Sequence, residues 1–559
     1  MTRALAESRI ALTPIFLLTG LALLAHLAHS GANAAPSPFP EPVNNEADDQ
    51  LPMAAAEAAA TVKMPPGFKV SVFASEPDIM NPIAMSWDAH GRLWVAENFT
   101  YARDGFYDMT VRDRILIFEG TDGEGHFKSR KVFNDEVQRV TSVEVGHGGV
   151  WVLGLTQLLF IPDRNEDGVQ DGPAQVIADG FTFGNLTSST HNGLKFGPDG
   201  WLYGRTAHNP VSPIVLTGAP EGARLELRGG GIWRYHPDRK VMETLSDGFV
   251  NSWGSDWDQH GELFFVSTVV QHFWYEAPGA HFVSSSREPN PYVYDLVDTI
   301  ADHRLDGTGL NGFGNAQRPV GGMIYRGDNW PAEYHGHFFT LNLFGHRMNH
   351  FIIERSGTAY VGRRGPDMFE MSDSWFRGID LNYGPDGGVF VIDWSDIGDY
   401  HDRTGVHRKS GRIYKVTFGD AKKSTVPDLG TLSVNQLVAL NTHVNEWFPR
   451  MARKELINRS LDGRGIGTAK EQLLAQFNQQ TEVPTKLRAL WTLYDLGGVD
   501  EALLRTLLRA SNEHLRVWAI RLLTDNWPID TVMSERPHPS VGGAEVNVPP
   551  ALLDRKSVV

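Results

Sequence analysis

The chain has 559 residues, of which 41% are hydrophobic, and a formal net charge of −16 from 51 Lys and Arg against 67 Asp and Glu. This length allows large buried cores and favours two or more structural units, while basic residues scattered singly along an acidic chain argue against a nucleic acid or an anionic membrane as partner. The sequence contains no cysteine, which excludes disulfides, thiolate metal sites and a covalently attached c-type haem.

Residues 1–34 have the features of a secretory signal peptide. Two arginines precede an apolar run from Ile10 to Leu27, and the small residues ending at Ala34 are typical of a cleavage site. We therefore expect export to the periplasm. The alternative is an uncleaved segment that anchors the protein to the membrane, facing the periplasm, because the apolar run approaches spanning length. Residues 35–63, rich in Pro, Ala and acidic side chains, are expected to form a flexible linker.

The next part of the chain repeats one short pattern. An alternating apolar strand, a turn with Asp or His before Gly, and a second apolar strand together predict a β-hairpin. Five clear copies are MSWDAHGRLWVAE (85–97), VEVGHGGVWVLG (143–154), LKFGPDGWLYGR (194–205), SDWDQHGELFFVS (255–267) and IDLNYGPDGGVFVID (379–393). The expected turn glycines are Gly91, Gly149, Gly200, Gly261 and Gly387. The last gap is about twice the others, and a degenerate sixth copy at 321–342 fills it.

Six copies of a strand-rich repeat predict a mainly β fold, a six-bladed β-propeller over residues 64–420. A β-sandwich is the alternative, but it would not repeat its hairpin with this regularity. FKVSVFASEP (68–77) and GRIYKVTF (411–418) stand at opposite ends of this region. We expect them to complete one blade together and so to close the ring.

Beyond the propeller, the apolar spacing changes from two residues to three or four. The segments 432–461 and 485–526 alternate apolar residues with charged faces in this way, which predicts amphipathic helices. We expect residues 430–527 to form a small α-helical region that resembles HEAT repeats. The Pro-rich residues 528–559 are expected to be a disordered tail.

The register of the repeat predicts where a site lies. In a blade, the first strand begins and the second strand ends on the same face of the ring, so residues at both places should surround one opening. The residues at the starts are Asn81, Arg139, Thr190, Asn251 and Arg377, with His191 one step on and Arg318 in the degenerate copy. The residues at the ends include Asn98, Arg205, His208, His272, His346, Asp393 and Asp396. These residues predict a polar, cation-rich mouth on the axis; the alternative is that they cap turns or join blades.

A histidine at this place could act as a base. A neutral imidazole of His191 on the axis could accept a proton from a substrate hydroxyl near physiological pH. The alternative is that His191 satisfies backbone groups at a blade junction.

The stretch DRNEDGVQD, 163–171, resembles the first part of a calcium loop. Oxygen-bearing side chains stand at positions 1, 3, 5 and 9, and a Gly stands at position 6. The candidate ligands are Asp163, Asn165, Asp167 and Asp171. The acid expected at position 12 is replaced by Ala174, so a solvated Asp-rich turn is the alternative to a structural calcium site.

Longer runs carry a family resemblance. The runs GGGIWRYHPDRKVMETLSDGFVNSWGSDWDQHGELFFVS, RPVGGMIYRGDNWPAEYHGHFFTLNLFGHRMN, SDSWFRGIDLNYGPDGGVFVIDWSD and HRKSGRIYKV resemble the membrane-bound dehydrogenase family abundant in planctomycetes and verrucomicrobia. That family is similar in turn to the soluble quinoprotein glucose and sorbosone dehydrogenases. The resemblance covers residues 64 to about 526, including the helical segment NEWFPRMAR.

The resemblance implies a cofactor and a reaction. In the soluble quinoproteins, pyrroloquinoline quinone (PQQ) lies across the axis with its carboxylates held by basic residues, while a histidine deprotonates the sugar hydroxyl and hydride passes to the quinone. His191 is similar in position to that histidine. The candidate cofactor-binding residues here are Arg139, Asn192, Asn251, Arg318, Arg377 and Arg412. The Arg-Asn pair of those enzymes is Val250-Asn251 in this chain, and the CxxCH haem motif of many relatives is absent, so electrons would pass to a separate, cytochrome-like acceptor.

Three functional hypotheses result. The first is an exported quinoprotein-like dehydrogenase that oxidises a sugar or polyol. The second is a non-catalytic propeller that binds a carbohydrate or a protein, with the helical region as a docking surface. The third is a calcium-dependent lactonase or esterase, which would need acidic residues on the axis where arginines are expected instead.

Overall fold

The computed structural model describes most of the chain between Phe39 and Trp527. The described residues are 39–45, 50–103, 106–122, 125–181, 191–206, 213–220, 225, 230–249, 251–268, 272–282, 296–297, 318–398, 405–420 and 428–527. All of them except Phe39 belong to one compact unit. The expected signal peptide and the expected disordered tail lie outside the described residues. No described helix combines the length and the apolar character needed to cross a membrane.

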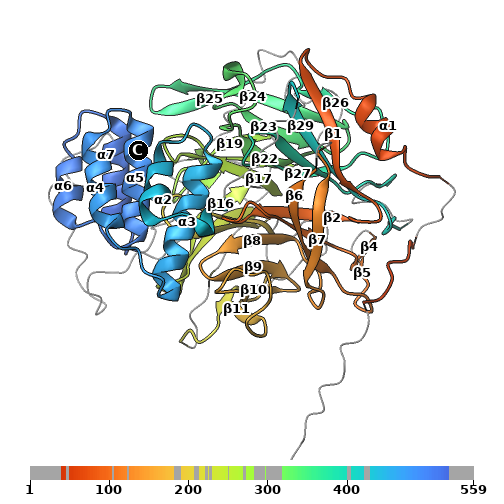
Figure 1. The fold of residues 1–559 in the computed structure, drawn as a ribbon, viewed down its shortest axis with the longest axis horizontal. Coiled ribbons are helices and arrows are strands. Elements are labelled where there is room, and N and C mark those ends of the chain that lie inside the picture. Colours follow the sequence, from red (N-terminus) through yellow and green to blue (C-terminus); the bar gives the residue numbers. More distant parts are fainter. Residues whose placement is uncertain are drawn as a thin grey trace, which may run out of the picture. The chain divides into compact units, whose positions relative to one another are not determined.

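The described strands form a six-bladed β-propeller. From the axis outward, the first blade contains β2 (Pro82–Trp87), β3 (Leu93–Glu97), β6 (Arg114–Thr121) and β7 (Phe127–Asn134). The second contains β8 (Ser142–Gly146), β9 (Gly149–Gly154), β10 (Gln157–Pro162), β11 (Gln175–Asp179) and β14 (Val215–Leu216). The third contains β12 (His191–Phe196), β13 (Leu202–Thr206), β15 (Gly230–His236) and β16 (Val241–Phe249), with β20 (His281–Phe282) and β21 (Leu296–Val297) at its outer edge. Figure 1 shows β8 to β11 in succession.

The remaining blades follow the same order. The fourth contains β17 (Ser252–Trp257), β18 (Leu263–Ser267) and β19 (Phe273–Tyr275). The fifth contains β22 (Pro319–Ile324), β23 (Phe338–Asn342), β24 (Arg347–Ser356), β25 (Ala359–Arg364) and β26 (Phe369–Glu370). The sixth contains β27 (Gly378–Tyr383), β28 (Val389–Asp393), β29 (Arg412–Phe418) and β1 (Phe68–Ser75). A separate hairpin pairs β4 (Tyr101–Arg103) with β5 (Phe106–Tyr107).

The innermost strands close a ring. β2, β8, β12, β17, β22 and β27 each contact the innermost strands of both neighbouring blades, including β27 with β2. Four apolar clusters fill the spaces between consecutive blades from the first to the fifth, and a fifth, larger cluster joins the fifth, sixth and first blades. Each sheet therefore buries both faces, as a propeller requires.

Ring closure occurs where it was expected. β1 pairs with β29 in antiparallel register from Phe68 opposite Phe418 to Ser75 opposite Arg412. The outermost strand of the last blade is thus supplied by the beginning of the propeller. The degenerate sixth copy is also confirmed as the hairpin β22 and β23, whose insertion contains the short helix η2 (Ala332–Tyr334).

The hairpin turns need left-handed backbone. Gly91, Gly200, Gly261 and Gly387 have φ between 75° and 77°, where a side chain would be strained. The second copy differs from the prediction by one residue. Its two-residue turn is His147-Gly148, with φ of 52° and 77°, while Gly149 begins β9. Positive φ at both turn residues is the geometry that a two-residue hairpin favours.

The segment predicted to be a flexible linker is partly folded onto the propeller. Helix α1 (Ala55–Ala60) packs against β1 with Ala58 fully buried. Before it, the Asn45 side chain donates to the carbonyl of Ala102 at 2.9 Å. Within the segment predicted to be a flexible linker, Asn45 and helix α1 therefore contact the propeller.

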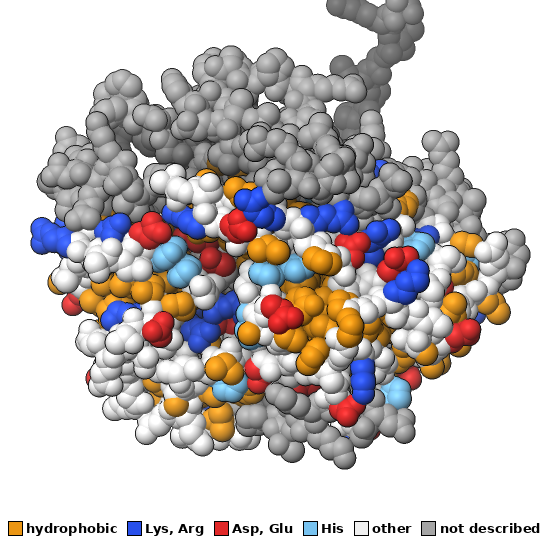
Figure 2. Space-filling view, turned by 90° about the horizontal axis from the view of Figure 1, so that it is seen from above, with side chains coloured by type: hydrophobic (Ala, Val, Ile, Leu, Met, Phe, Trp, Pro, Cys, Tyr) orange, Lys and Arg blue, Asp and Glu red, His pale blue; other side chains and the backbone are white. Residues whose placement is uncertain are grey.

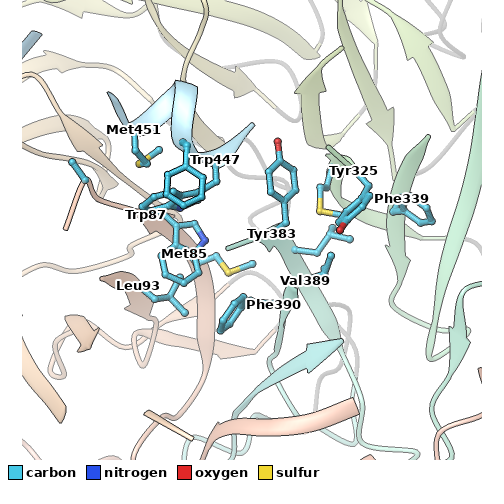
Figure 3. Close-up of a cluster of buried hydrophobic side chains, with 14 of the residues drawn as sticks. Met85, Trp87, Leu93, Tyr325, Phe339, Tyr383, Val389, Phe390, Trp447 and Met451 are labelled. Carbon is cyan, nitrogen blue, oxygen red and sulfur yellow. The ribbon is translucent and has the colours of Figure 1, made fainter. Parts of the chain in front are cut away.

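The helical region follows the propeller. Its elements are η3 (Leu429–Thr431), α2 (Val434–Ala439), η4 (Leu440–Thr442), α3 (Trp447–Asp462), α4 (Ala469–Gln479), α5 (Val483–Asp495), α6 (Glu501–Leu507) and α7 (Glu513–Leu523). Trp447 and Met451 of α3 lie beside Trp87 of the first blade (Figure 3), and the Trp87 and Trp447 ring centroids are 6.4 Å apart. Helices and blades therefore share one apolar core.

Basic and acidic side chains are interspersed on one face of the described part of the molecule. In the face shown in Figure 2, Lys and Arg lie next to Asp and Glu rather than in one field of a single sign. This arrangement agrees with the scattered charges of the sequence and gives a polyanion no continuous basic surface on this face.

Candidate functional site

A cavity of about 110 Å³, the mouth cavity, lies where the innermost strands begin. Its described lining residues are Ile83, Asn98, Tyr101, Tyr107, Thr141, Asn251, Trp253, Thr268, Val320, Leu343, Arg377, Ile379, Trp394, Asp396, Gly398 and Val406. The starts or ends of inner strands in five of the six blades contribute to this wall, so the cavity lies on the propeller axis. The register argument had predicted an opening at this end of the axis, and of the residues it named Asn98, Asn251, Arg377 and Asp396 line the cavity.

Asn251 and Thr268 provide the polar groups of the fourth blade. Asn251 has a left-handed φ of 53° at the start of β17, and its carbonyl accepts a hydrogen bond from the Thr268 amide at 2.8 Å. Both side chains are at least 95% buried. Among the described residues, neither Asn251 Oδ1 nor Thr268 Oγ1 has a hydrogen-bond partner. Because a buried polar atom without a partner costs free energy, these two oxygens indicate a ligand or water at the cavity wall.

Aromatic rings form the opposite part of the wall. The Tyr101 ring packs edge-on against Tyr107 at 5.7 Å and against Trp394 at 6.0 Å. Burial raises the pKa of Tyr107 to about 12, although Arg139 opposes the shift. The Arg139 guanidinium lies 4.1 Å from the Tyr107 ring centroid. This predicted cofactor ligand therefore makes a cation–π contact with an aromatic residue of the wall.

Arg377 lines the cavity, as expected. Its guanidinium donates to the backbone carbonyls of Gly398 at 2.8 Å and Ile397 at 2.6 Å. It also donates to Ser374 O at 2.7 Å and lies 3.0 Å from His346 Nε2. The arginine thus orders the segment after β28. Among the described lining residues it is the only Lys or Arg.

Asp396 is the acidic group of the wall. Its carboxylate accepts hydrogen bonds from the His407 amide at 3.1 Å and the Gly398 amide at 3.0 Å, and it lies 3.2 Å from His407 Nδ1. The pair is buried beside Trp375, whose ring centroid lies 4.5 Å from that of His407. Asp396 therefore fixes the backbone and the imidazole of a neighbouring segment at the edge of the cavity.

The axial channel continues beneath the mouth. Asn192 lines it, donates to Ser252 O at 3.0 Å, and accepts from Arg205 Nε at 3.1 Å. Asp380 also lines this part, and burial raises its pKa to about 6 although Lys195 and Arg205 oppose the shift. Asn192, predicted to bind a cofactor, thus joins the third blade to the fourth.

Helix α3 closes the other end of the axis. Arg450 of α3 lies 3.0 Å from a carboxylate oxygen of Asp256. Lys195 of β12 lies 2.9 Å from the same oxygen. Lys454 of α3 lies 2.7 Å from Glu144. Burial alone would raise the pKa of Asp256, but Arg450 and Lys195 hold it below its usual value. The basal cavity between α3 and the blades is lined by charged and aromatic residues, namely Glu144, Lys195, Arg450, Lys454, Trp87, Tyr383 and Trp447.

His191 does not belong to the described wall of the mouth cavity. Its ring packs edge-on against Phe181 at 4.8 Å, with Nδ1 3.2 Å from Thr206 Oγ1. Its backbone carbonyl accepts a hydrogen bond from Thr141 at 2.5 Å. Arg318 is also outside this wall, and its guanidinium lies 5.4 Å from the Phe344 ring centroid. The predicted Thr190 and His208 lie outside the described residues.

Arg412, predicted to bind a cofactor, is held by acidic partners away from the mouth cavity. It is completely buried, and its guanidinium donates to Asp373 at 2.8 Å and to Glu76 at 3.0 Å. A third contact joins it to the Tyr414 hydroxyl at 3.1 Å. Arg412 therefore stabilises the junction of β29 with the chain that leaves β1.

The predicted calcium loop follows β10 and is held by its own hydrogen bonds. The Asp163 carboxylate accepts from the Gly168 amide at 3.1 Å, Asp167 accepts from the Val169 amide at 2.7 Å, and Asp171 accepts from the Arg164 amide at 2.5 Å. Asn165 donates to Asp167 at 2.9 Å. In the part of the chain that the structure describes, no group of three or more His, Asp or Glu side chains could hold a metal ion. Asp163 Oδ1 is buried without a hydrogen-bond partner among the described residues, and the calcium site stays a prediction.

Two features of the site were missed. The aromatic residues of the wall lie in loops or strands without a repeated motif, so the register did not identify them. The sequence predicted amphipathic helices in this region but did not identify the basic residues of α3 as part of a site. Their spacing, with Trp447, Arg450 and Lys454 at i, i+3 and i+7, was the available signal for one buried face.

One family model, described as a domain of unknown function (DUF7133), matches residues 54–419. No curated protein matches the chain. Among solved structures, the chain is similar to the PQQ-bound aldose sugar dehydrogenase of Streptomyces coelicolor, at 17% identity and a TM-score of 0.40 over 64% of this chain and 99% of that one. It is similar to the pyranose dehydrogenase PQQ domain of Coprinopsis cinerea at 12% identity and a TM-score of 0.39 over 64% and 97%. The apo form of the soluble aldose sugar dehydrogenase of Escherichia coli gives 14% identity and a TM-score of 0.37 over 63% and 99%.

Proposed function

Because the chain belongs to the DUF7133 family, whose description names no activity, its function has to follow from its own site, and we propose that the mouth cavity binds a polyhydroxylated, sugar-like ligand. The observation that carries this proposal is the pair of buried oxygens, Asn251 Oδ1 and Thr268 Oγ1, that have no hydrogen-bond partner among the described residues. A ligand with several hydroxyl groups can donate to both. A purely apolar ligand would leave both unsatisfied.

The rest of the wall supports the same ligand class. Trp253, Trp394, Tyr101 and Tyr107 give apolar and aromatic surface for the C–H face of a sugar ring. Few polar groups set in a mostly apolar concave wall are typical of small-molecule sites. Asp396 adds an acceptor at the edge of the cavity.

Oxidation of the bound hydroxyl with PQQ is the second candidate, and the sequence resemblance is what favours it. The described wall does not by itself fit the three carboxylates of this cofactor, because Arg377 is its only cation and donates to backbone carbonyls. Arg139 and Arg412 are held by other partners. We therefore derive no reaction step through the quinone, and the base role of His191 stays a prediction.

Isothermal titration calorimetry with a panel of monosaccharides, disaccharides and polyols tests the binding proposal. The double variant Asn251→Leu with Thr268→Val should lose affinity by about tenfold or more for any sugar that the native protein binds. Asn435→Leu on the exposed surface of α2 is the control and should bind normally. Absence of binding across the panel, or unchanged binding by the double variant, would contradict the proposal.

Reconstitution separates the two candidates. The purified protein is mixed with PQQ and calcium, and bound-cofactor absorbance and dye reduction are followed with each sugar that binds. Turnover that His191→Ala abolishes would support oxidation with this base. Sugar binding without cofactor binding or turnover would leave a binding protein and reject the oxidation.

A further inference from the structure

A second cavity, the lateral cavity, has a volume of about 250 Å³ and shares no lining residue with the mouth cavity. It lies between the third and fourth blades and the end of the helical region. Its lining residues are Asp199, Tyr203, Arg234, Leu245, Trp257, Gly261, Leu263, Glu276, Pro278, Trp518, Arg521, Leu522, Thr524, Asp525 and Trp527. None of these residues was identified from the sequence as part of a site.

Glu276 is the distinctive group of this wall. It directly follows β19, and its side chain is buried with 2% of the residue exposed. One carboxylate oxygen, Oε2, accepts a hydrogen bond from Ser246 at 2.7 Å. The other, Oε1, has no hydrogen-bond partner among the described residues. A buried carboxylate oxygen left in this state beside a cavity indicates a missing donor.

The arginines of the cavity are matched by other acids. Arg521 donates to Glu262 at 2.8 Å and to the carbonyl of Gly261 at 3.2 Å. Arg234 donates to Asp199 at 3.0 Å and to Glu243 at 2.7 Å. Asp525 accepts from Trp201, Arg239 and Tyr494. These pairs leave Glu276 as the carboxylate of the wall for which the structure gives no cationic hydrogen-bond partner.

Aromatic side chains form much of the remaining wall. Trp257 packs edge-on against Tyr203, with ring centroids 5.1 Å apart. Trp518 is held by a hydrogen bond from its Nε1 to the carbonyl of His260 at 2.6 Å, and Trp527 follows α7. Several aromatic rings and a carboxylate lining one cavity are the groups that recognise alkylated ammonium ions, because the ring faces are negative and the carboxylate supplies the charge.

Other occupants fit less well. An anion would meet Glu276, whereas the lining arginines Arg234 and Arg521 already have carboxylate partners. Each bound water molecule needs two to four polar partners. The tryptophan and leucine side chains that form much of the wall present apolar surface instead. Metal ligation fails for the described residues, because no group of three or more His, Asp or Glu side chains is arranged for it.

We propose that the lateral cavity is a binding site for a small organic cation with an alkylated ammonium group, with Glu276 as its counter-ion and the tryptophans as its walls. This inference does not depend on sugar binding at the mouth cavity. Burial raises the pKa of Glu276 to about 8, with Ser246 and Arg521 lowering it and Asp247 raising it. The bound cation would favour the ionised carboxylate, so binding should strengthen as the pH rises through this value.

Calorimetric titration of the full chain with choline, compared with its uncharged isostere 3,3-dimethylbutan-1-ol, tests the proposal. At a pH above the Glu276 pKa of about 8, choline should bind at least about tenfold more tightly than the alcohol. Glu276→Gln should remove this preference. Glu333→Gln, which removes one negative charge at an exposed position, should keep it.

A second variant covers the case in which Glu276→Gln does not fold. Trp527→Leu changes a partly exposed wall residue and should weaken choline binding by about tenfold while the thermal unfolding temperature stays close to that of the native protein. Equal binding of choline and the alcohol, no choline binding, or choline binding that neither variant changes would overturn the proposal.

Discussion

Two threonines of the mouth cavity differ in whether their hydroxyl group has a hydrogen-bond partner. Thr141 Oγ1 donates to the carbonyl of His191 at 2.5 Å, whereas Thr268 Oγ1 has no partner among the described residues. Thr141→Val should therefore lower the free energy of unfolding by about 1 to 2 kcal/mol, because it leaves a buried carbonyl unsatisfied. Thr268→Val should leave it unchanged or raise it. Urea denaturation followed by circular dichroism measures both, and an equal loss for the two variants would show that Thr268 is satisfied.

Glu276 predicts a pH dependence of stability. Its pKa is about 8 in the folded protein against 4.5 ordinarily, so between these values the folded state holds a proton that the unfolded state releases. Raising the pH therefore favours unfolding until it passes the folded pKa. Glu276→Gln removes this effect, and its stability relative to the native protein should rise by about 2 kcal/mol from about pH 6 to about pH 8. Thermal melts across this range check the sign; a constant difference would contradict it.

The residue scale was the least predictable from sequence. The positions of Arg139 and Arg377 near the mouth follow from the repeat register, but the direction of each guanidinium depends on neighbours that are far apart in the chain. Arg139 lies over Tyr107, and Arg377 donates to carbonyls of the segment after β28. A period of two fixes the face of a strand on which a residue lies, and it does not determine what a long, flexible side chain at the strand end contacts.

At the scale of elements, α3 behaves as part of the propeller. Its Arg450 pairs with Asp256 of the fourth blade and its Lys454 pairs with Glu144 of the second. Arg450→Met should lower the free energy of unfolding by about 3 kcal/mol, because Asp256 keeps only Lys195 as a cationic partner in a buried place. Chemical denaturation gives this value.

The matched control is Arg509→Met, at an exposed position after α6. It should change the free energy of unfolding by less than about 0.5 kcal/mol. If both variants cost the same, the ion pair between α3 and the fourth blade does not stabilise the protein.

The hairpins and the helix α3 show what sequence could and could not reveal about elements. The hairpins are local: alternating apolar residues and a left-handed glycine such as Gly200 specify strand, turn and strand within about a dozen residues. The docking of α3 joins residues about 200 to 300 positions apart, as the pair Lys454 and Glu144 illustrates. A lysine on a helix is normally solvated, so the spacing of Trp447, Arg450 and Lys454 indicates one face of α3 but does not show what that face contacts.

At the scale of the whole molecule, the ring depends on one strand from the start of the propeller. Deletion of residues 1–76 removes β1, the outermost strand of the sixth blade, and exposes the edge of β29. It also removes Glu76, a partner of Arg412. Differential scanning calorimetry should show a melting temperature lower by roughly 10 °C or more.

The control for this deletion removes residues 1–38, none of which is described, and leaves α1 and β1 in place. It should melt close to the full chain. Closure itself was predictable, because two unpaired strand patterns at the ends of a six-fold repeat have only each other to complete a blade. The folding of residues 50–63 onto the propeller was not predictable, because the Ala-rich and Pro-rich composition of this segment does not show which surface lies beside the segment.

The position of α3 at the base of the ring has a consequence for how ligands reach the axial channel. Because α3 and its ion pairs lie across the base of the ring, a ligand of the mouth cavity is expected to enter and leave on the mouth side. Two different ligands of the mouth cavity would therefore compete for one entrance.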